Sequence, residues 1–119
     1  MTPTDLEMLR GTLDVLILRT LSWGPAHGYA VASWIEHVTG QALAIEEGSL
    51  YPALHRLERR GWLQSEWGLS ENNRRAKFYE LTAAGRAQLG VETSAWVRFA
   101  TAVARVLDSP ERPAWATER

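Results

Sequence analysis

The sequence contains no cysteine, and this absence excludes a disulfide framework, a cysteine-ligated zinc site and a thiol nucleophile. Long apolar runs are also absent, since none approaches the roughly 18 residues that a membrane-spanning helix needs. The N-terminus lacks the charged start, the apolar stretch and the small-residue cleavage site of a signal peptide. From these absences we expect a cytoplasmic protein.

Motifs of enzymes and of metal sites are missing as well. The three histidines, His27, His37 and His55, show no metal-ligand spacing. Neither a glycine-rich phosphate loop nor a Gly-x-Ser-x-Gly nucleophile motif occurs. We therefore expect no enzymatic activity, no metal and no cofactor.

An excess of charge is absent too, because the net charge of the 119 residues is −1. On its own, this value argues against a protein that binds nucleic acid. The charges are unevenly distributed, however: residues 55–77 carry six basic and three acidic side chains, whereas residues 1–54 carry two basic and six acidic ones. Because a partner responds to the local field, the basic stretch indicates either a binding surface for an anionic partner or an ordinary solvated surface.

The apolar pattern predicts helices and one hairpin. With 45% apolar and 23% charged residues, the composition is globular, and the length suits one domain with its own core. Apolar spacing and turn residues predict a helix ending at Leu21, a helix over 26–38, a short strand over 41–45, a third helix over 49–60 capped by Ser49, extended segments over 62–67 and 76–81, and a last helix over 82–107.

This order of elements is typical of a winged helix-turn-helix, a mainly α fold with a small β-hairpin (α+β). We expect a winged helix-turn-helix DNA-binding domain over 1–81 and a long C-terminal dimerisation helix over 82–107. A flexible tail is expected over 108–119.

The third helix is predicted to be amphipathic. A helical wheel places Leu50, Leu54 and Leu57 on one narrow apolar stripe. The opposite face collects Tyr51, Pro52, His55, Arg56 and Arg59. Such a face fits either a helix that reads the DNA major groove or an ordinary surface helix. The hairpin favours the first interpretation, because its basic tip lies where a wing would meet flanking phosphates.

The last helix carries an apolar seam. Leu89, Trp96 and Val103 recur at intervals of seven residues, as do Phe99 and Val106, in the manner of the a and d positions of a coiled coil. No later element is predicted to cover this seam, so the same helix of a second copy is the simplest partner, in a two-fold dimer. The alternative is a helix that folds back on the first helix of its own chain.

Six short motifs lie in the predicted winged helix-turn-helix. They are LRGTLD at 9–14, HGY at 27–29, EEGSLYPALHRL at 46–57, SEWG at 65–68, NNRRAK at 72–77 and LTAAG at 81–85. Over residues 6 to about 90, the chain thus resembles the PadR family of transcriptional regulators, in its short form with a single C-terminal helix. The motifs of the third helix and the wing are specific, whereas LTAAG occurs in other winged-helix regulators. The resemblance implies a dimeric transcription factor, usually a repressor, that binds a roughly palindromic operator and releases it on a signal.

The predicted DNA-binding residues lie on the third helix and on the hairpin tip. They are Ser49, Tyr51, Pro52, His55, Arg56, Arg59, Arg74, Arg75 and Lys77. Ser49, Tyr51 and Pro52 begin the third helix, where amides and the helix dipole favour phosphate. The resemblance implies that Tyr51, His55 and Arg56 face the DNA, with Arg56 as the best candidate for a bidentate contact to guanine. The cations of the tip are expected to hold phosphates rather than to select sequence.

Alternative interpretations stay open at this point. Tyr51 is either a DNA contact or a structural ring packed on the second helix, and His55 is either a DNA contact or a solvated neighbour of Glu58 or Arg59. For the whole protein, the alternative is a winged-helix module that binds another protein and not DNA. Such a module would carry an apolar outer face on its third helix and a neutral wing, unlike this sequence.

Trp96 and Phe99 indicate a ligand site. In the predicted dimer, Trp96 approaches its symmetry mate across the axis, and Phe99 follows one turn later. The resemblance to multidrug-sensing short PadR proteins implies that such aromatic side chains sandwich a planar ligand at the dimer centre. The alternatives are ordinary packing in the seam and a constitutive repressor that senses no ligand. The expected partners are therefore double-stranded operator DNA, a second copy of the chain and a small aromatic ligand.

Overall fold

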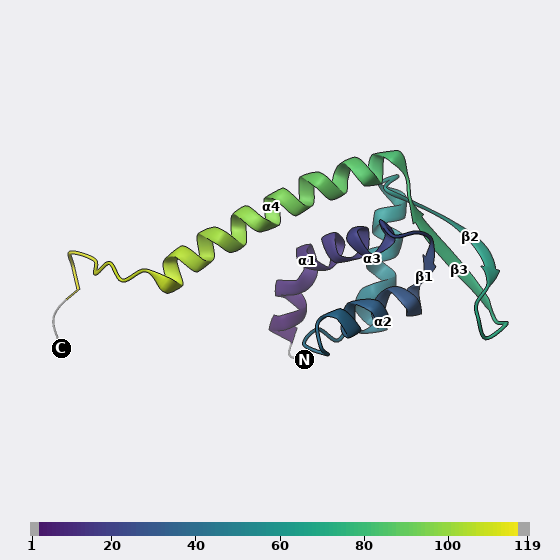
Figure 1. The fold of residues 1–119 in the computed structure, drawn as a ribbon, viewed down its shortest axis with the longest axis horizontal. Helices are drawn as coiled ribbons and strands as arrows, with labels where there is room; N and C mark the ends of the chain where they lie inside the picture. The colour runs from purple at the N-terminus through teal and green to yellow at the C-terminus, as the bar shows by residue number, and fades with distance from the viewer. Residues whose placement is uncertain (1–2, 117–119) are drawn as a thin grey trace.

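Four helices and three strands form the part of the chain that the computed structural model describes, namely residues 3–116, with side chains described from residue 11 onward. The elements are α1 (Pro3–Leu21), β1 (Ala26–His27), α2 (Gly28–Val38), α3 (Glu47–Arg59), β2 (Leu63–Leu69), β3 (Arg75–Leu81) and α4 (Ala83–Asp108). Figure 1 shows α1, α2 and α3 gathered into one body, from which the β2–β3 hairpin projects on one side and α4 on the other. This arrangement confirms the predicted winged helix-turn-helix. Within residues 3–116, none of the helices combines the length and the apolar character that a membrane span requires.

The core lies where α1, α2, α3 and the base of the hairpin meet. Its buried side chains are Leu13, Ile17, Leu18 and Leu21 of α1, Val31 and Ile35 of α2, Leu50, Ala53, Leu54 and Leu57 of α3, and Leu63, Tyr79 and Leu81 of the hairpin. Burying one leucine side chain contributes about 1.5–3 kcal/mol to stability. The apolar stripe predicted for the third helix is confirmed, and its burial fixes which face of α3 turns outward.

The sheet contains a strand that the sequence did not predict. β1 pairs with residues 78–79 of β3, so that the strand order is β1–β3–β2 and both pairs are antiparallel. The prediction of a short strand over 41–45 was wrong. This segment is a loop that lies against the end of α2. There the Ile45 amide donates to the Glu36 carboxylate at 3.1 Å. The Glu36 side chain thus accepts the hydrogen bond of a backbone amide that, in the predicted strand, would pair with a neighbouring strand.

Two helices begin at other residues than predicted. α2 begins at Gly28 rather than at residue 26, because the two residues before it pair with β3. α3 begins at Glu47, two residues before the predicted cap. The Ser49 amide donates to the Glu46 carbonyl at 3.0 Å, so Ser49 lies inside the first turn instead of capping it. Glu47, in the first turn of α3, interacts favourably with the helix dipole.

The hairpin is longer, and its tip shorter, than predicted. β2 and β3 pair along their whole lengths and leave only residues 70–74 as the tip. Within the tip, the Ser70 amide donates to the Arg74 carbonyl at 2.9 Å, and Asn73 has a positive φ of 59°. Asparagine tolerates this left-handed conformation better than most residues do. The hairpin therefore forms the wing of the winged helix, with Arg74 in its turn and Arg75 and Lys77 on β3.

The start of α4 is pressed against the turn that follows α3. Thr82 Oγ1 accepts from the Gly85 amide at 3.0 Å and caps the helix, as predicted. Gly85 comes so close to the preceding chain that a Cβ there would lie 2.0 Å from the Trp62 carbonyl oxygen. Only glycine permits this approach, and the approach fixes α4 on the base of the wing.

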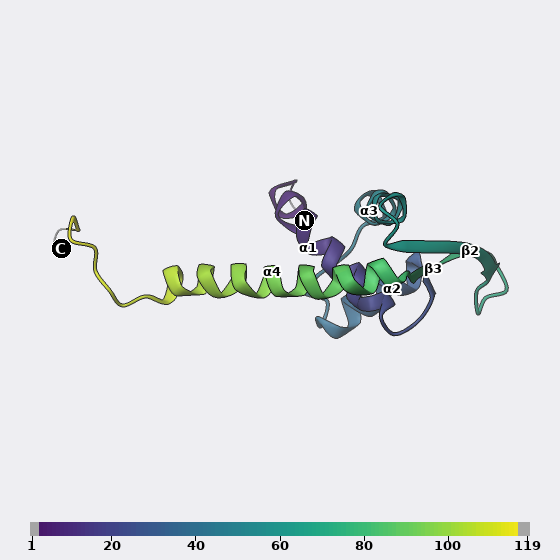
Figure 2. The same cartoon turned by 90° about the horizontal axis from the view of Figure 1, so that it is seen from above.

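The rest of α4 passes over α1 and then leaves the body (Figure 2). Where the two helices meet, the Trp96 indole N–H donates to Thr12 Oγ1 at 3.0 Å. The helix ends at Asp108, one residue beyond the predicted end, and residues 109–116 follow without a helix. The last part of the predicted tail, residues 117–119, lies outside the described residues. The described chain is elongated as a result, with extents of 65 × 29 × 21 Å.

Candidate nucleic-acid interface

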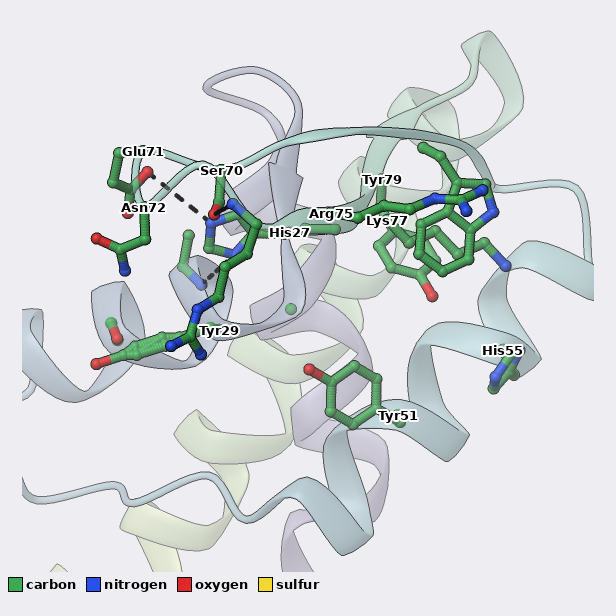
Figure 3. Close-up of a pocket in the computed structure, with 16 residues that line it drawn as sticks. His27, Tyr29, Tyr51, His55, Ser70, Glu71, Asn72, Arg75, Lys77 and Tyr79 are labelled. Carbon is green, nitrogen blue, oxygen red and sulfur yellow. Dashed lines mark hydrogen bonds and ion pairs between the residues drawn. The ribbon is translucent and has the colours of Figure 1, made fainter.

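A groove of about 1000 Å³ lies between the start of α2, the outer face of α3 and the wing. Figure 3 shows Tyr51 and His55 of α3 on one side of this groove and side chains of the wing on the other. His27 and Tyr29, at the start of α2, complete the lining. Three elements that are distant in the sequence thus form one continuous surface.

The outer face of α3 presents three side chains at intervals of four residues. Tyr51, His55 and Arg59 are all exposed, and this spacing puts them on one face of the helix. In the described part of the chain, neither the His55 nor the Arg59 side chain has a hydrogen-bond or ion-pair partner. Pro52 is exposed beside them, and Ser49 is half-buried in the first turn. This face is therefore open to a partner.

Tyr51 combines packing with exposure. Its ring lies against the backbone of Gly28, where an added Cβ would be 2.9 Å from Cε1 and 3.0 Å from the hydroxyl oxygen. The side chain is nevertheless 39% exposed and borders the groove. The contact with the second helix that we had considered as an alternative is present. Tyr51 thus spaces α3 from α2 and still offers its ring edge to the groove.

Arg56 occupies a different position from the one that the helical wheel indicated. Its guanidinium forms an ion pair and a hydrogen bond with the Asp14 carboxylate of α1. The two side chains are 27% and 15% exposed, so the pair lies largely inside the interface between the helices. The wheel placed Arg56 on the outer face, but a long side chain at the edge of that face reaches the neighbouring helix. The exposed face of α3 is thus smaller than predicted.

The three basic residues of the wing have different surroundings. Arg74 is exposed, and in the described part of the chain its side chain has no partner. The Arg75 guanidinium lies over the Trp67 ring, 4.6 Å from its centroid, and is also exposed. Lys77 is half-buried, with Nζ 3.6 Å from a carboxylate oxygen of Glu58. Arg74 and Arg75 are therefore the cations that the wing offers to solvent.

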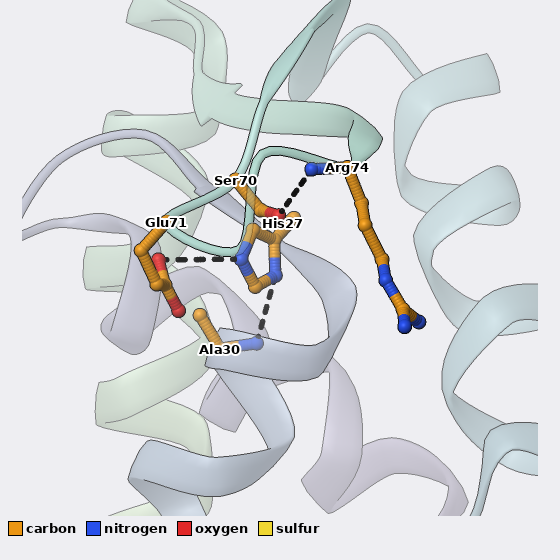
Figure 4. A network of polar contacts seen from close by, with 5 residues as sticks. All are labelled: His27, Ala30, Ser70, Glu71 and Arg74. Carbon is orange, nitrogen blue, oxygen red and sulfur yellow. Dashed lines mark hydrogen bonds and ion pairs between the residues drawn. The ribbon is translucent and has the colours of Figure 1, made fainter.

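His27 connects the start of α2 with the wing (Figure 4). Its Nδ1 accepts from the Ala30 amide at 3.1 Å and so caps α2. On the other side of the ring, Nε2 lies 4.0 Å from the Glu71 carboxylate at the wing tip. The ring also meets Phe78 of β3 edge to face, at 5.3 Å between centroids. Because Nδ1 accepts a hydrogen bond, the ring proton of the neutral imidazole is on Nε2, facing the wing.

Burial raises the pKa of the Tyr79 phenol above its ordinary value of 10.0. The Glu58 carboxylate and Tyr51 raise this pKa further, because negative charge near the phenol disfavours its ionised form. Tyr79 therefore stays neutral in the floor of the groove.

Sequence reasoning missed two residues that line the groove, His27 and Trp67, and two that hold cations of α3 and the wing, Asp14 and Glu58. The signal for Asp14 was its place as an acidic residue between apolar neighbours in the first helix. His27 was part of a quoted motif, but histidine is not among the preferred N-cap residues. The sequence therefore predicted a start for α2 that is two residues too early. Trp67 was part of the quoted SEWG motif, but the sequence pointed to no partner for Trp67 or for Glu58, because those partners lie on other elements.

The apolar seam of α4 divides into two parts. Leu89 is half-buried and packs on the core of its own chain, and Trp96 is hydrogen-bonded to α1 while its side chain stays 44% exposed. Beyond them, Phe99, Val103 and Val106 are exposed. The first half of the seam therefore folds back on α1, as in the alternative given for the last helix.

A small hollow of about 300 Å³ between α1 and α4 is lined by Gly11, Thr12, Val15, Glu92, Ala95, Trp96 and Phe99.

A winged helix with an exposed outer face on α3 and a basic wing is typical of DNA-binding transcription regulators. The chain belongs to the PadR-like family of transcriptional regulators, whose family model matches residues 17–91. The resemblance stated from the sequence is thus confirmed.

Two solved structures and one relative found by sequence agree with this assignment. The chain is 33% identical to the PadR family transcriptional regulator of Eggerthella lenta, with a TM-score of 0.71 over 89% of this chain and 90% of that one. A transcriptional regulator of Clostridium thermocellum is 27% identical, with a TM-score of 0.72 over 89% of this chain and 99% of that one. The transcriptional regulator Rv3488 of Mycobacterium tuberculosis is 33% identical over 84 residues, which are 70% of this chain and 74% of the relative.

Proposed function

We propose that the protein is a dimeric, sequence-specific repressor that binds a palindromic operator through α3 and the wing. The observation that carries this proposal is the common orientation of α3 and the wing around one groove. Tyr51, His55 and Arg59 are exposed on α3, and Arg74 and Arg75 are exposed on the wing beside them. This surface matches a major-groove helix flanked by phosphate contacts.

Sequence reading belongs to the exposed side chains of α3. His55 and Arg59 are one helical turn apart and lack partners in the described part of the chain, so they are available to base edges. Arg56 would have to leave Asp14 to reach a guanine. We therefore assign base contacts first to His55 and Arg59, with Tyr51 and Pro52 beside the DNA backbone, and we give Arg56 a positioning role.

Affinity for the DNA backbone belongs to the wing and to the start of α3. Arg74 and Arg75 lie on the tip side of the wing, where they neutralise phosphates without selecting bases. Ser49, in the first turn of α3, offers its hydroxyl near the helix N-terminus, while its amide is bonded to the Glu46 carbonyl. A protein-binding module would instead need an apolar outer face on α3, and the exposed residues there do not provide one.

Dimerisation is supported by the second half of α4. This half extends beyond the body and exposes the large apolar side chains of Val97, Phe99, Val103, Val106 and Leu107. Pairing with the same helix of a second copy along the face of Phe99, Val103 and Val106 buries these three side chains in a two-fold interface. Two recognition helices related by this axis match the two halves of a palindrome.

Ligand sensing is supported by the hollow between α1 and α4. Its wall combines the aromatic rings of Trp96 and Phe99 with the polar groups of Thr12 and Glu92. A second copy of α4 would add a further pair of rings and enclose a planar aromatic ligand. Quenching of tryptophan fluorescence by candidate ligands, with release of bound DNA, is expected; DNA binding that no ligand changes would indicate a constitutive repressor.

The test of DNA binding is a gel-shift titration against the DNA upstream of the protein's own gene, at two salt concentrations and with excess competitor. We expect a discrete complex that resists competitor DNA. His55→Ala and Arg59→Ala are expected to lower the preference for the operator by about tenfold or more each, as for the loss of a base contact worth about 1–3 kcal/mol. Arg98→Ala is the matched control, since it removes the same charge from an exposed position of α4.

Binding that competitor DNA abolishes would contradict sequence-specific recognition of that site. A selection from random DNA sequences then separates a wrong operator from a protein that does not read DNA. The repressing sense, which is usual for the regulators that the sequence resembles, is checked with a promoter-reporter strain. Higher expression on deletion of the gene supports repression, and lower expression indicates an activator.

A further inference from the structure

Glu58 contacts both strands of the wing from the recognition helix. Its Oε2 accepts a hydrogen bond from the Ser65 hydroxyl of β2 at 2.5 Å. Its Oε1 lies 3.6 Å from Lys77 Nζ of β3. Glu58 and Lys77 are 30% and 31% exposed, so both charges are partly withdrawn from solvent. One carboxylate thus joins α3 to both strands near the base of the hairpin.

The sheet register puts the two contacts on the same face of the wing. Ser65 is opposite Tyr79 in the hairpin, and Lys77 is opposite Trp67, two residues further towards the tip. Residues two apart on a strand, and residues opposite one another on paired strands, share a face. Lys77 Nζ also lies over the Tyr79 ring, 5.7 Å from its centroid. The face that carries these contacts is the one that turns towards α3 and the groove.

We propose that Glu58 sets the position of the wing relative to the recognition helix, and that Lys77 is its counter-charge rather than a phosphate ligand. Lys77 was predicted to hold phosphate together with Arg74 and Arg75. The structure gives it a carboxylate partner, whereas the Arg74 side chain has none within the described residues and Arg75 keeps its guanidinium on an exposed aromatic ring. Each protomer therefore brings two wing cations, not three, to the DNA backbone. This inference rests on the proposed DNA-binding function.

The salt dependence of DNA binding tests the counter-charge role. Each phosphate that a protein neutralises adds about 0.9 to the slope of log K against log salt concentration. Arg74→Gln is expected to flatten the slope by about 0.9 per protomer, and Lys77→Gln is expected to leave it unchanged. Glu58→Gln keeps an oxygen acceptor for Ser65 but releases Lys77, so the slope should become steeper by up to about 0.9 per protomer. In the double variant Glu58→Gln/Lys77→Gln, the slope should return to that of the wild type.

Glu66→Gln is the matched control. Glu66 lies next to Ser65 on β2, on the opposite face of the wing, and is exposed without a partner in the described part of the chain. Its substitution changes the net charge as Glu58→Gln does, so a slope that steepens equally in both variants would overturn the proposal. A slope that flattens in Lys77→Gln as much as in Arg74→Gln would overturn it too. A merely structural role for Glu58 would weaken binding without steepening the slope.

Amide hydrogen exchange of the unbound protein tests the positioning role without DNA. In Glu58→Gln and in Lys77→Gln, residues 63–69 of β2 are expected to exchange several-fold faster, whereas Glu66→Gln leaves their rates unchanged. Unchanged exchange in Glu58→Gln would overturn the positioning role. If the wild type binds no DNA, the proposed function fails, while exchange in the wing still decides whether Glu58 holds it.

Discussion

The Arg56 guanidinium of the recognition helix is bonded to the Asp14 carboxylate of α1, 42 residues earlier in the chain. Both residues lie in motifs by which the sequence resembles its family. The pair joins α3 to the helix on which α4 rests, since Thr12 of α1 accepts the hydrogen bond from Trp96. Thr12 and Asp14 are two positions apart, so they face different sides of α1.

Removal of either partner of this pair is expected to destabilise the fold. A hydrogen bond between charged groups contributes about 1.5–3 kcal/mol, and each of Asp14→Asn and Arg56→Met leaves one largely buried partner without its counterpart. The double variant should lose less than the sum of the two single losses, with a coupling of about 1 kcal/mol. Denaturant unfolding of the four proteins measures this cycle.

DNA binding by the same variants separates positioning from base reading. If Arg56 positions α3, both single variants lower affinity for the operator to a similar extent. If Arg56 contacts a guanine, Arg56→Met alone removes the preference for one base pair, and a footprint of each variant on operators substituted at each position would reveal that loss. Lys is no substitute here, because it lacks the planar fork that fits a carboxylate.

Charge in the second half of the α4 seam is expected to dissociate the proposed dimer. Val103 lies in the exposed part of the seam, and Val103→Asp would bury a carboxylate in an apolar interface. Sedimentation velocity should show a monomer at concentrations where the wild type is a dimer. Thr101→Asp, which adds the same charge on the opposite side of the helix, should leave the dimer intact. A dimer in both variants would place the interface elsewhere.

His27 is expected to stabilise α2 through its cap. His27→Ala leaves the Ala30 amide without its acceptor and should cost about 1 kcal/mol of unfolding free energy. Asparagine is a strong N-cap residue, so His27→Asn should recover much of this loss. Thermal unfolding followed by circular dichroism measures both. Equal losses in the two variants would mean that the ring contact with Phe78 matters more than the cap.

Gly85 and Gly90 of α4 are expected to respond to alanine in opposite directions. In Gly85→Ala, the new Cβ meets the Trp62 carbonyl oxygen, a backbone atom that cannot move aside, and the variant should lose about 3 kcal/mol or more. A Cβ added at Gly90 would meet no atom of the described residues within 4 Å, so Gly90→Ala should stabilise the helix by about 0.5–1 kcal/mol. Chemical denaturation of both variants measures these changes in unfolding free energy. A tolerated Gly85→Ala would show that α4 is not held tightly against Trp62.

Alkaline pH is expected to destabilise the protein through Tyr79. Its pKa is raised in the folded state, so the unfolded chain ionises this phenol first as the pH rises. The stabilising contribution is complete below about pH 10 and is lost as the pH rises through the pKa of the folded state. The unfolding free energy of Tyr79→Phe should therefore fall less steeply above pH 10 than that of the wild type. Parallel curves would show that Tyr79 does not contribute to the alkaline transition.

Local patterns in the sequence were sufficient to predict the elements that form the reading surface. The spacing of Leu50, Leu54 and Leu57 determines which side of the third helix is buried, so the opposite side had to be exposed. Turn residues between two extended runs likewise predicted the hairpin. Such patterns act within one or two helical turns or one strand, which is why sequence alone carries them.

Pairings between distant segments were not predictable in this way. β1 has only two residues and owes its strand conformation to the edge of β3, some fifty residues later. Nothing in the local sequence pairs Asp14 with Arg56 or Glu58 with Lys77; the fold brings these charges together. The sequence therefore shows where the basic residues lie along the chain. The structure shows which of them are already paired with a carboxylate of the same chain.

The close approach of Gly85 to Trp62 makes α4 a lever with a fixed pivot. The helix has 26 residues, and at 1.5 Å per residue it is about 39 Å long. A tilt of about 5° at the pivot would displace the far end by about 3 Å, close to the rise of one base pair. In a dimer joined along α4, a small change in the seam would thus alter the separation of the two reading helices by about one base-pair step, enough to lose register with an operator of fixed spacing.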